Sequence, residues 1–419
     1  MTHTLQDTKT KTGAYPIIVI SLCACYLFYK YVLQIYPSVI TEQLMHDYGL
    51  SAAGLGYLAA TFYYAYMVTQ LVVGVLIDKY GTRWLSSMAL FSCSIGVLIF
   101  SMSETVLTAA LSRGLMGFGV AFATVAYMKL AAGWFPPRQY AFVGGLLATA
   151  AMAGAVFGQA PLSYAVSLMG WRSCLFACGI AGMILTLAFV TIVRDAPSVV
   201  HHTDIMENYR VEMKDVLQVI KSKQNWLLTL YSGLAFSPIA IFGGLWGNPF
   251  LEQAYDLSKT QTASMVSLVF IGLGLGSPLI GMLSDYLGSR RNVMIISTLI
   301  SCAAILLVLY CHPMPIWLLS FLLFTFGFSL GAFMLVFAIG KELNPPFLTA
   351  TVISMINASD AVISGITEPA IGKMLDMTWS GGTLNGIQVF TLENYHIAMS
   401  VLPLYLALAA ILLFWVKKQ

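Results

Sequence analysis

Apolar residues follow one another along this chain in long, nearly unbroken runs. Twelve of these runs reach the length of about 20 residues that a helix needs to cross a bilayer. They cover approximately residues 15–40, 53–77, 84–103, 105–134, 141–166, 173–193, 225–250, 262–284, 292–310, 316–341, 348–375 and 396–416. The pattern therefore predicts an all-α integral membrane protein with twelve transmembrane helices.

A repeated motif divides the chain into two related halves. Gly74, Asp78, Gly81 and Arg83 follow the second run, and Gly281, Asp285, Gly288 and Arg290 follow the eighth at a constant offset of 207 positions. The widest polar gap lies between runs six and seven, so we expect two pseudo-symmetric six-helix bundles at residues 1–196 and 225–419, with a cytoplasmic linker at 197–224. Transporters built from such repeats bind substrate near the bilayer midplane, where the repeats meet.

The composition of the chain excludes several classes of protein. Hydrophobic residues make up 58% of the chain and charged residues 9%, whereas about a quarter of a soluble domain is charged. The formal net charge of +3 is too small to suggest nucleic acid as a partner. Seven cysteines show no metal-ligand spacing, so we expect no metal and no cofactor. No Walker loop occurs, so we do not expect ATP to drive transport directly, and no HExxH motif occurs. We therefore expect a transporter rather than an enzyme.

Basic residues set the expected orientation, because Lys and Arg are retained on the cytoplasmic side. One set of alternate loops, with the termini, carries Lys9, Lys11, Lys79, Arg83, Arg138, Arg194, Arg210, Lys214, Lys221, Lys223, Arg290, Arg291, Lys417 and Lys418. The other set carries little beyond Arg172, Lys259 and Lys373. Both termini and the central linker are therefore predicted to be cytoplasmic, in a bacterial inner membrane.

The loop motifs resemble those of the major facilitator superfamily. The resemblance rests on the GxLxDxxGxR pattern after spans two and eight, the run Arg113-Gly-Leu-Met-Gly117-Phe-Gly119, and Gly170-Trp171-Arg172. It implies the major facilitator fold and transport by alternating access. The segment Gly154-Ala-Val-Phe-Gly158-Gln-Ala-Pro161 departs from the glycine-rich motif of drug exporters, which argues against an antiporter.

Residues 29–70 are similar to the phagosomal nutrient transporters of intracellular bacteria. This second resemblance implies uptake of an amino acid, or in some members a nucleoside, with protons as the driving force. It leads us to expect proton symport of a small solute. Separately, we expect a monomer embedded in lipid.

Charged residues inside spans are candidate site residues, because each costs about 2.5 to 3.5 kcal/mol at a helix centre. Lys30 lies on one face of span one with Gln34, and we predict that both line the binding cavity. Arg113 in span four is also predicted to bind substrate, although a buried ion pair that stiffens the N-terminal half is the alternative.

Span eleven carries a polar stripe of Asn357, Asp360, Ser364 and Glu368. A carboxylate near the midplane is costly, so Asp360 is our first candidate for proton coupling and Glu368 the second, while Asn357 is a candidate substrate ligand. The alternative for Asp360 is permanent pairing with Lys30 or Arg113 as a structural lock.

Polar and aromatic residues complete the predicted pocket. Tyr63 and Tyr66 share a face of span two, and Trp246 and Asn248 lie in span seven, although such aromatics more often pack or anchor at interfaces. The loop residues Asp78, Arg83, Asp285, Arg290 and Arg291 are predicted to gate the cytoplasmic side, or simply to fix topology and packing. Spans three, nine and twelve carry no charged residue and are expected at the periphery.

These observations favour proton-coupled uptake of an amino acid, because Lys30 and Arg113 would bind its carboxylate and Asp360 its amino group or a proton. One alternative is a transporter of an anionic metabolite, a polycarboxylate siderophore or a nucleoside. Another is a nutrient sensor that does not transport, although the linker offers only a small output surface.

Overall fold

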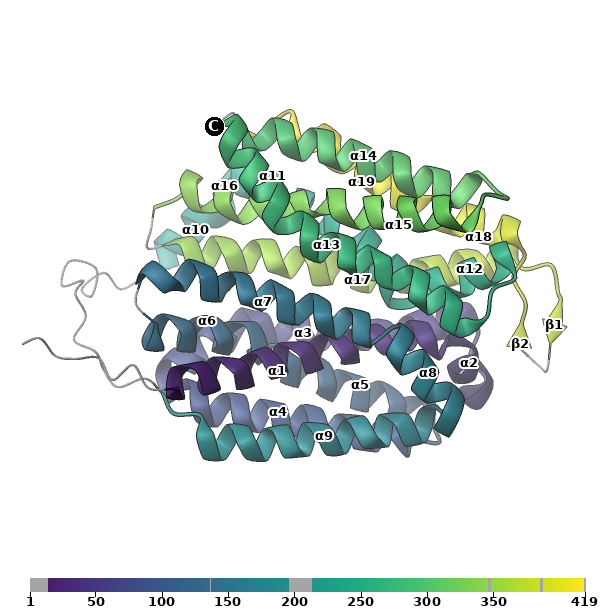
Figure 1. The fold of residues 1–419 in the computed structure, drawn as a ribbon, viewed down its shortest axis with the longest axis horizontal. Helices are drawn as coiled ribbons and strands as arrows, with labels where there is room; N and C mark the ends of the chain where they lie inside the picture. The colour runs from purple at the N-terminus through teal and green to yellow at the C-terminus, as the bar shows by residue number, and fades with distance from the viewer. Residues whose placement is uncertain (1–13, 136, 196–212, 346–347, 385–386, 418–419) are drawn as a thin grey trace, which may run out of the picture.

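The computed structural model describes residues 14–135, 137–195, 213–345, 348–384 and 387–417, and its helices form two bundles that lie side by side (Figure 1). The N-terminal bundle contains α1 (Tyr15–Ile35), η1 (Tyr36–Val39), α2 (Thr41–Tyr48), α3 (Ala52–Tyr80), α4 (Thr82–Ser101), α5 (Val106–Val120), α6 (Phe122–Trp134), α7 (Pro137–Phe157), α8 (Ala160–Met169) and α9 (Trp171–Ile192). The C-terminal bundle contains α11 (Lys223–Ile241), η2 (Phe242–Trp246), α12 (Gly247–Tyr255), α13 (Lys259–Leu287), α14 (Arg290–Tyr310), α15 (Ile316–Leu330), η3 (Gly331–Met334), α16 (Leu335–Leu343), α17 (Thr349–Thr378), α18 (Leu392–Met399) and α19 (Val401–Leu413).

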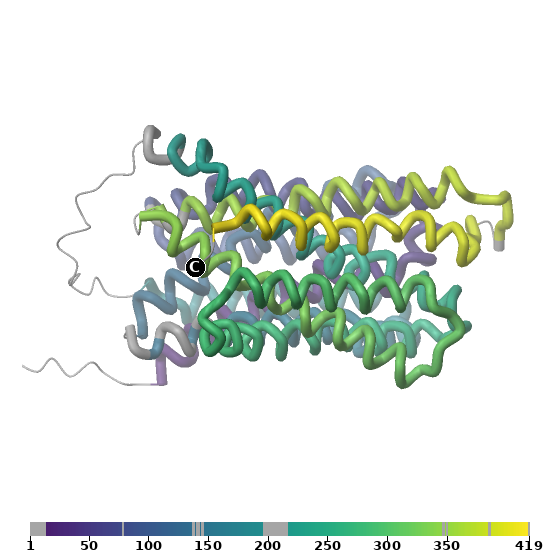
Figure 2. The backbone as a smooth tube through the Cα atoms, turned by 90° about the horizontal axis from the view of Figure 1, so that it is seen from above, coloured from purple at the N-terminus to yellow at the C-terminus, as the bar shows by residue number. Residues whose placement is uncertain are grey.

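Short elements connect and flank the bundles. The helix α10 (Met213–Lys221) occupies part of the segment expected to be a linker. An antiparallel hairpin of β1 (Thr383–Leu384) and β2 (Ile387–Gln388) follows α17. We call the end of the molecule where α1 begins and α19 ends the terminal end, and the opposite end, which carries α2, α12 and the hairpin, the distal end (Figures 1 and 2).

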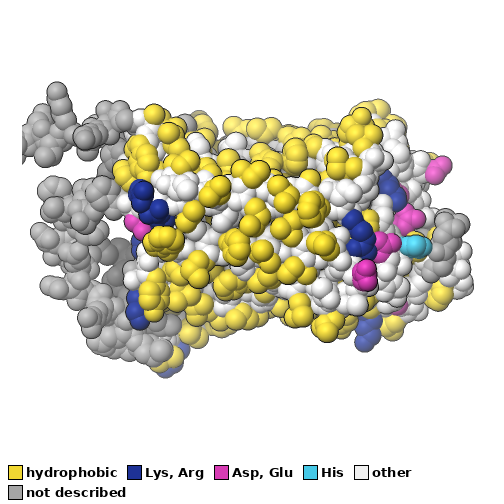
Figure 3. Space-filling model, turned by 90° about the horizontal axis from the view of Figure 1, so that it is seen from below, with side chains coloured by type: hydrophobic (Ala, Val, Ile, Leu, Met, Phe, Trp, Pro, Cys, Tyr) yellow, Lys and Arg dark blue, Asp and Glu magenta, His cyan; other side chains and the backbone are white. Residues whose placement is uncertain are grey.

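The helices have the length and composition of membrane spans. Within the described part of the chain, eleven segments are long and apolar enough to cross a bilayer. The twelfth, α17, is a helix of 30 residues that runs the length of the molecule beside them (Figure 1). Its polar stripe, with Asp360 and Glu368, makes it less apolar than its neighbours. An apolar belt separates charged residues at the two ends (Figure 3), so the predicted membrane fold is confirmed.

Two helix pairs form the seam between the bundles, α3 with α17 and α7 with α13. Glycines allow their backbones to approach closely. A Cβ atom added at Gly56 would lie 2.6 Å from the carbonyl oxygen of Glu368, and one added at Gly372 would lie 2.2 Å from that of Ala52. The helices α4, α9, α14 and α19 lie at the outer edges, as expected for the uncharged spans three, nine and twelve (Figure 1).

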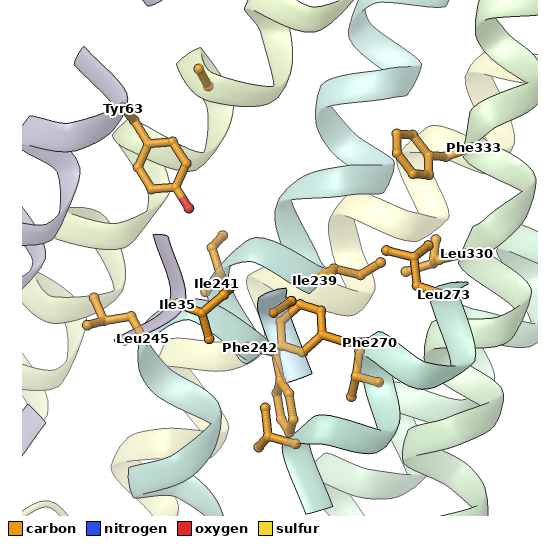
Figure 4. Packing of buried hydrophobic residues seen from close by; sticks show 14 of the residues in the cluster. Ile35, Tyr63, Ile239, Ile241, Phe242, Leu245, Phe270, Leu273, Leu330 and Phe333 are labelled. Carbon is orange, nitrogen blue, oxygen red and sulfur yellow. The ribbon is translucent and has the colours of Figure 1, made fainter. Parts of the chain in front are cut away.

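Span seven is interrupted at its centre. The helix α11 contains Pro238 and passes into the π-helical turn η2 before α12 continues to the distal end. Gly243 in this turn leaves room for the ring of Phe270, since an added Cβ would lie 2.3 Å from it. Buried apolar side chains surround the turn (Figure 4). This break makes α12 a segment separate from α11. Turns of π-helix are frequent at functional sites.

The second glycine of each repeated motif lies at a helix end with positive φ. Gly81 precedes α4 with φ of 85°, and Gly288 ends α13 with φ of 61°. Residues other than glycine rarely adopt these backbone φ values, which explains why both halves carry glycine at this position.

Close packing inside the C-terminal bundle gives a test of the fold. Valine at Gly276 would place its Cβ about 2.0 Å from the carbonyl oxygen of Phe328, whereas nothing lies within 4 Å of a Cβ at Gly281 on the same helix. We expect Gly276→Val to lower stability by at least about 1–3 kcal/mol, and Gly281→Val to have a much smaller effect. Thermal unfolding of the purified proteins measures this difference. Equal melting temperatures of the two variants would contradict the packing of α13 against α15.

Candidate functional site

Lys30 lies between the bundles among aromatic rings. Its side chain is 5% exposed, and its Nζ donates a hydrogen bond of 3.2 Å to the hydroxyl of Tyr66. The same Nζ lies 4.7 Å from the ring centre of Tyr66 and 5.1 Å from that of Tyr31. Cation–π attraction and one hydrogen bond hold the ammonium group in place. Among the described residues, no carboxylate forms an ion pair with it.

Asp360 faces the same region from α17. Its Oδ1 accepts a hydrogen bond of 2.7 Å from the hydroxyl of Ser232, and part of its surface is exposed. It interacts electrostatically with Lys30, Tyr31 and Tyr66. We call Lys30, Tyr31, Tyr66, Ser232 and Asp360 the central cluster. Asn357, one turn earlier on α17, is also partly exposed, so helix geometry places it beside this cluster.

Gln34 and Tyr63 adjoin the central cluster on its distal side. The amide Nε2 of Gln34 donates a hydrogen bond of 3.3 Å to the Tyr63 hydroxyl. Tyr63 is 4% exposed, and its hydroxyl points toward Ile35 and Ile241 (Figure 4). This pair therefore lies at the boundary between the central cluster and the closed distal half.

Arg113 is buried, with 2% of its surface exposed. Its guanidinium donates hydrogen bonds of 2.9 and 3.2 Å to the carbonyl oxygens of Leu33 and Ala59 and lies between the rings of Tyr36 and Phe62. Its Nε has no partner. In this conformation Arg113 joins three helices of the N-terminal bundle and is closed to solvent, so its substrate-binding role stays a prediction.

Glu368 lies deeper along α17 than Asp360 and is 2% exposed. Its carboxylate oxygen Oε2 has no hydrogen-bond partner, and the charged group that acts on it electrostatically is Arg113. Trp246 donates a hydrogen bond of 3.3 Å to the backbone oxygen of Glu368. Glu368 and Trp246 thus meet inside the closed distal half, away from the central cluster.

A network of amide and hydroxyl groups joins the bundles near the distal end, and we call it the distal seal. Asn248 donates to the Ser38 carbonyl at 3.1 Å and to the Gln159 oxygen at 2.9 Å. Gln159 in turn donates to the Ser38 hydroxyl at 3.0 Å and to the Gly243 carbonyl at 2.5 Å. Asn248 thus joins the two bundles in this conformation, and its predicted role in substrate binding stays a prediction.

Asp376 adds a second link between the bundles. Its two carboxylate oxygens accept hydrogen bonds of 3.0 and 2.9 Å from the backbone N–H groups of Ala52 and Ala53 at the start of α3. An anion at a helix N-terminus also interacts favourably with the helix dipole. An ion pair between Glu42 and Lys259 bridges the bundles nearby. The hydrogen bonds between bundles that join two described residues extend from Tyr64 and Gly365, near the middle of α3 and α17, to the distal end, so this conformation is closed distally.

A pocket of about 340 Å³ lies on the distal face above the seal. Both bundles contribute to its walls, and three of its acidic residues are Glu42, Glu252 and Asp256. Two residues that line the pocket also take part in the contacts below it. Ser38 belongs to the distal seal, and Trp246 donates a hydrogen bond to the backbone of Glu368. The pocket is thus separated from the central cluster by the closed seam.

The predicted gating residues make contacts within single bundles. Arg83 donates two hydrogen bonds to the Val190 carbonyl, and Arg291 donates one of 3.0 Å to that of Val416. Arg290 forms ion pairs with Asp285, at 3.5 Å, and with Glu342. The side chain of Asp78 lies outside the described residues. Their gating role remains a prediction.

The Gly170-Trp171-Arg172 motif builds a distal corner around Asp47. Trp171 donates a hydrogen bond of 3.0 Å to Asp47, and Arg172 lies 3.3 Å from the same carboxylate oxygen. Partial burial opposes ionisation of Asp47, but hydrogen bonds from His46 and Trp171 and the charge of Arg172 lower its pKa below the ordinary value. The motif therefore fixes α2 to α9 inside the N-terminal bundle.

The Asp376 link can be tested by hydrogen–deuterium exchange. We expect Asp376→Asn to speed amide exchange in residues 36–56, because hydrogen bonds to a charged group contribute about 1.5–3 kcal/mol. Asp195→Asn is a matched control, since Asp195 caps α4 through Thr82 and Arg83 within one bundle. Faster distal exchange in both variants, or in neither, would contradict a link specific to the bundle interface.

Sequence comparison identifies the family. The sequence model of the family described as Major Facilitator Superfamily matches residues 22–247 and 228–419 of this chain. The chain belongs to the Major Facilitator Superfamily. A solved bacterial homologue of the human lysosomal transporter Spinster, in an inward-facing and occupied conformation, shares this facilitator fold with a TM-score of 0.80 and 15% identity, covering 97% of each chain.

Curated relatives of this facilitator include transporters of sugar acids. The "Probable galactarate/D-glucarate transporter GudP" of Bacillus subtilis is 22% identical over 392 residues, covering 85% of this chain and 84% of that protein. The "Probable L-galactonate transporter" of Escherichia coli is 23% identical over 290 residues, covering 65% and 63%. The phagosomal family suggested by residues 29–70 is not confirmed by these comparisons.

The structure brings together some predicted site residues of this facilitator and separates others. Lys30, Tyr66 and Asp360 meet in the central cluster, and Gln34, Tyr63 and Asn357 adjoin it. Arg113, Trp246, Asn248 and Glu368 lie in the closed distal half. Sequence reasoning missed Tyr31, Ser232, Gln159 and Asp376; Gln159 had been visible as a polar residue within an apolar run.

Proposed function

We propose that this facilitator transports a small organic anion together with a proton by alternating access. The observation that carries the proposal is the central cluster, where a basic group, Lys30, and an acidic group, Asp360, interact electrostatically in one region between the bundles. Lys30 would bind the substrate carboxylate, and Asp360 would carry the proton. Both groups lie on the terminal side of the distal seal, where Lys30 is buried and Asp360 keeps part of its surface exposed.

Electrostatics supply the coupling. Without substrate, the charges of Lys30 and Asp360 balance each other in a region of low dielectric constant. A bound carboxylate takes the ammonium group as its partner, which leaves the Asp360 anion uncompensated. A proton on Asp360 restores neutrality, because unpaired charge inside a membrane protein is costly. One proton would therefore accompany each monovalent anion.

Two substrate classes fit this arrangement. The names of the relatives favour hydroxy acids of the sugar-acid type. An amino acid, which the sequence first suggested, would place its carboxylate on Lys30 and its ammonium group on Asp360, and would then need no proton for neutrality. Members of both classes carry at least one carboxylate and additional hydrogen-bond donors. The dependence of uptake on the proton gradient distinguishes them.

The membrane arrangement is proposed from charge. Lys79, Arg83, Arg290, Arg291 and Lys417 lie at the terminal end, which we therefore assign to the cytoplasm of a bacterial inner membrane. The distally closed conformation would then face inward. We expect a monomer whose partners are the solute, protons and lipid.

Uptake into proteoliposomes tests the proposal. The panel contains labelled galactonate, galactarate and several amino acids, each with and without an inwardly directed proton gradient. Accumulation of a hydroxy acid that depends on the gradient supports anion–proton symport. Accumulation of amino acids alone would assign Asp360 to the ammonium group, and uptake of neither class would overturn the proposed substrate.

A further inference from the structure

We propose that His312 and His396 form a binding site for a divalent transition-metal ion at the distal end of the C-terminal bundle, with Glu393 as a third ligand. His312 lies in the loop after α14, and His396 belongs to α18. Neither residue takes part in the central cluster or the distal seal, and the cysteine spacing gave no expectation of a metal site.

The two imidazole rings face each other edge to edge. Their Nε2 atoms lie 2.9 Å apart, the ring centres are separated by 5.1 Å, and the ring planes differ by 4°. In this geometry one nitrogen donates a proton to the other, and the tautomers of the two rings decide which one donates. Once this proton is lost, both lone pairs point at a common position, which a metal ion can occupy with a modest separation of the rings, since Zn–N bonds measure about 2.0–2.1 Å.

The outer nitrogens of both rings have partners. The ring of His396 makes a hydrogen bond to the backbone carbonyl of Leu309, and Nδ1 of His312 lies 3.5 Å from the Tyr255 hydroxyl. Histidines that bind metals usually donate their second ring N–H to a carbonyl or another oxygen, which fixes the tautomer and the ring orientation. The pair already has this supporting shell, so little reorganisation precedes metal binding.

Glu393 provides an oxygen ligand on the same helix face as His396. The two residues are spaced i, i+3, as in the Glu-x-x-His pairs of carboxylate-bridged metal proteins, and Glu393 acts electrostatically on His396. In the described part of the chain, no three His, Cys, Asp or Glu side chains are already arranged around a common position for a metal ion. The exposed side chain of Glu393 therefore has to turn toward the pair, giving two nitrogen ligands and one oxygen ligand with water in the remaining position.

Metal binding at this place would restrain the distal half of span seven. The ring of Phe250 on α12 lies 5.9 Å from that of His312 and 6.1 Å from that of Tyr395, the neighbour of His396. Asn248 of the distal seal lies on the same short helix. A metal that fixes α18 to the loop after α14 would hinder movement of α12, so we expect Zn²⁺ to slow transport reversibly.

Zinc binding to the purified full-length protein tests the site without reference to transport. We would titrate Zn²⁺ in competition with a fluorescent chelator, and we expect His312→Gln and His396→Gln each to weaken binding at least tenfold. Glu393→Gln should weaken it several-fold. His46→Gln removes another histidine from the distal end and should leave the affinity unchanged, because His46 pairs with Asp47 on α2.

The outcomes separate clearly. Equal Zn²⁺ affinity in the wild type and the double histidine variant would overturn the site, and unchanged affinity in Glu393→Gln would remove the carboxylate ligand. If a histidine variant fails to fold, the wild type loaded with Cu²⁺ still decides, since its electron paramagnetic resonance spectrum should show two nitrogen ligands. One nitrogen or none would contradict the proposal.

Discussion

In proteoliposomes, the Asp360→Asn variant is expected to lose accumulation driven by an inward proton gradient while it still exchanges labelled for unlabelled substrate. Asparagine keeps the shape of the side chain and can still interact with Ser232, but it cannot carry a proton. If one proton accompanies each monovalent anion without net charge movement, a gradient of one pH unit supports about tenfold accumulation. The variant should fall to no accumulation.

Ser232→Ala is the matched control for this variant. It removes the hydrogen bond of 2.7 Å to Asp360 but keeps the carboxylate, so the gradient dependence should persist. Gradient-driven accumulation by Asp360→Asn equal to that of the wild type would exclude Asp360 as the proton carrier. Glu368, with its unpartnered oxygen Oε2, would then become the first candidate.

Replacing Lys30 by glutamine should have the largest effect on substrate binding. The ammonium group is held by Tyr31 and Tyr66 and has no direct carboxylate partner among the described residues, which leaves it available to an anion. Truncation of one partner of a desolvated charge pair typically costs about 2–5 kcal/mol. We expect at least a thirtyfold rise in the dissociation constant, measured by isothermal titration calorimetry in detergent.

Two further lysine variants separate charge from packing. Lys30→Arg retains the positive charge and should recover part of the affinity. Lys129→Gln changes another lysine inside a span, whose Nζ donates to the Ile77 carbonyl within the N-terminal bundle, and should bind substrate normally. An affinity for the anion in Lys30→Gln within threefold of the wild type would contradict the assigned role of Lys30.

Which residues share a face of one helix is the part of the candidate site that the sequence can predict. Lys30 and Gln34 share a face of α1, and Asn357 and Asp360 share a face of α17, because helical periodicity fixes both relations in advance. The clustering of α1 with α17 followed from the rule that repeats meet at the midplane. The fold was predictable because long apolar runs indicate the spans and the repeated loop motif indicates the two halves.

Contacts across the bundle interface were not predictable in this way. Asp376 and Ala52 are 324 positions apart, and a carboxylate at a span end reads in sequence as an ordinary exposed residue. Asn248 likewise read as a pocket residue, because its partners Ser38 and Gln159 belong to the other bundle and lie 210 and 89 positions away in the sequence. Helical periodicity carries no information about such pairs.

The distal pocket has a consequence for the control of this protein by small molecules. Its walls come from both bundles, with Glu42 on one side and Glu252 and Lys259 on the other, so it exists in this form only while the distal half is closed. A compound that fills it would bind one conformational state and, by linkage, raise the population of that state. Such a compound would arrest the transport cycle without competing for the substrate site.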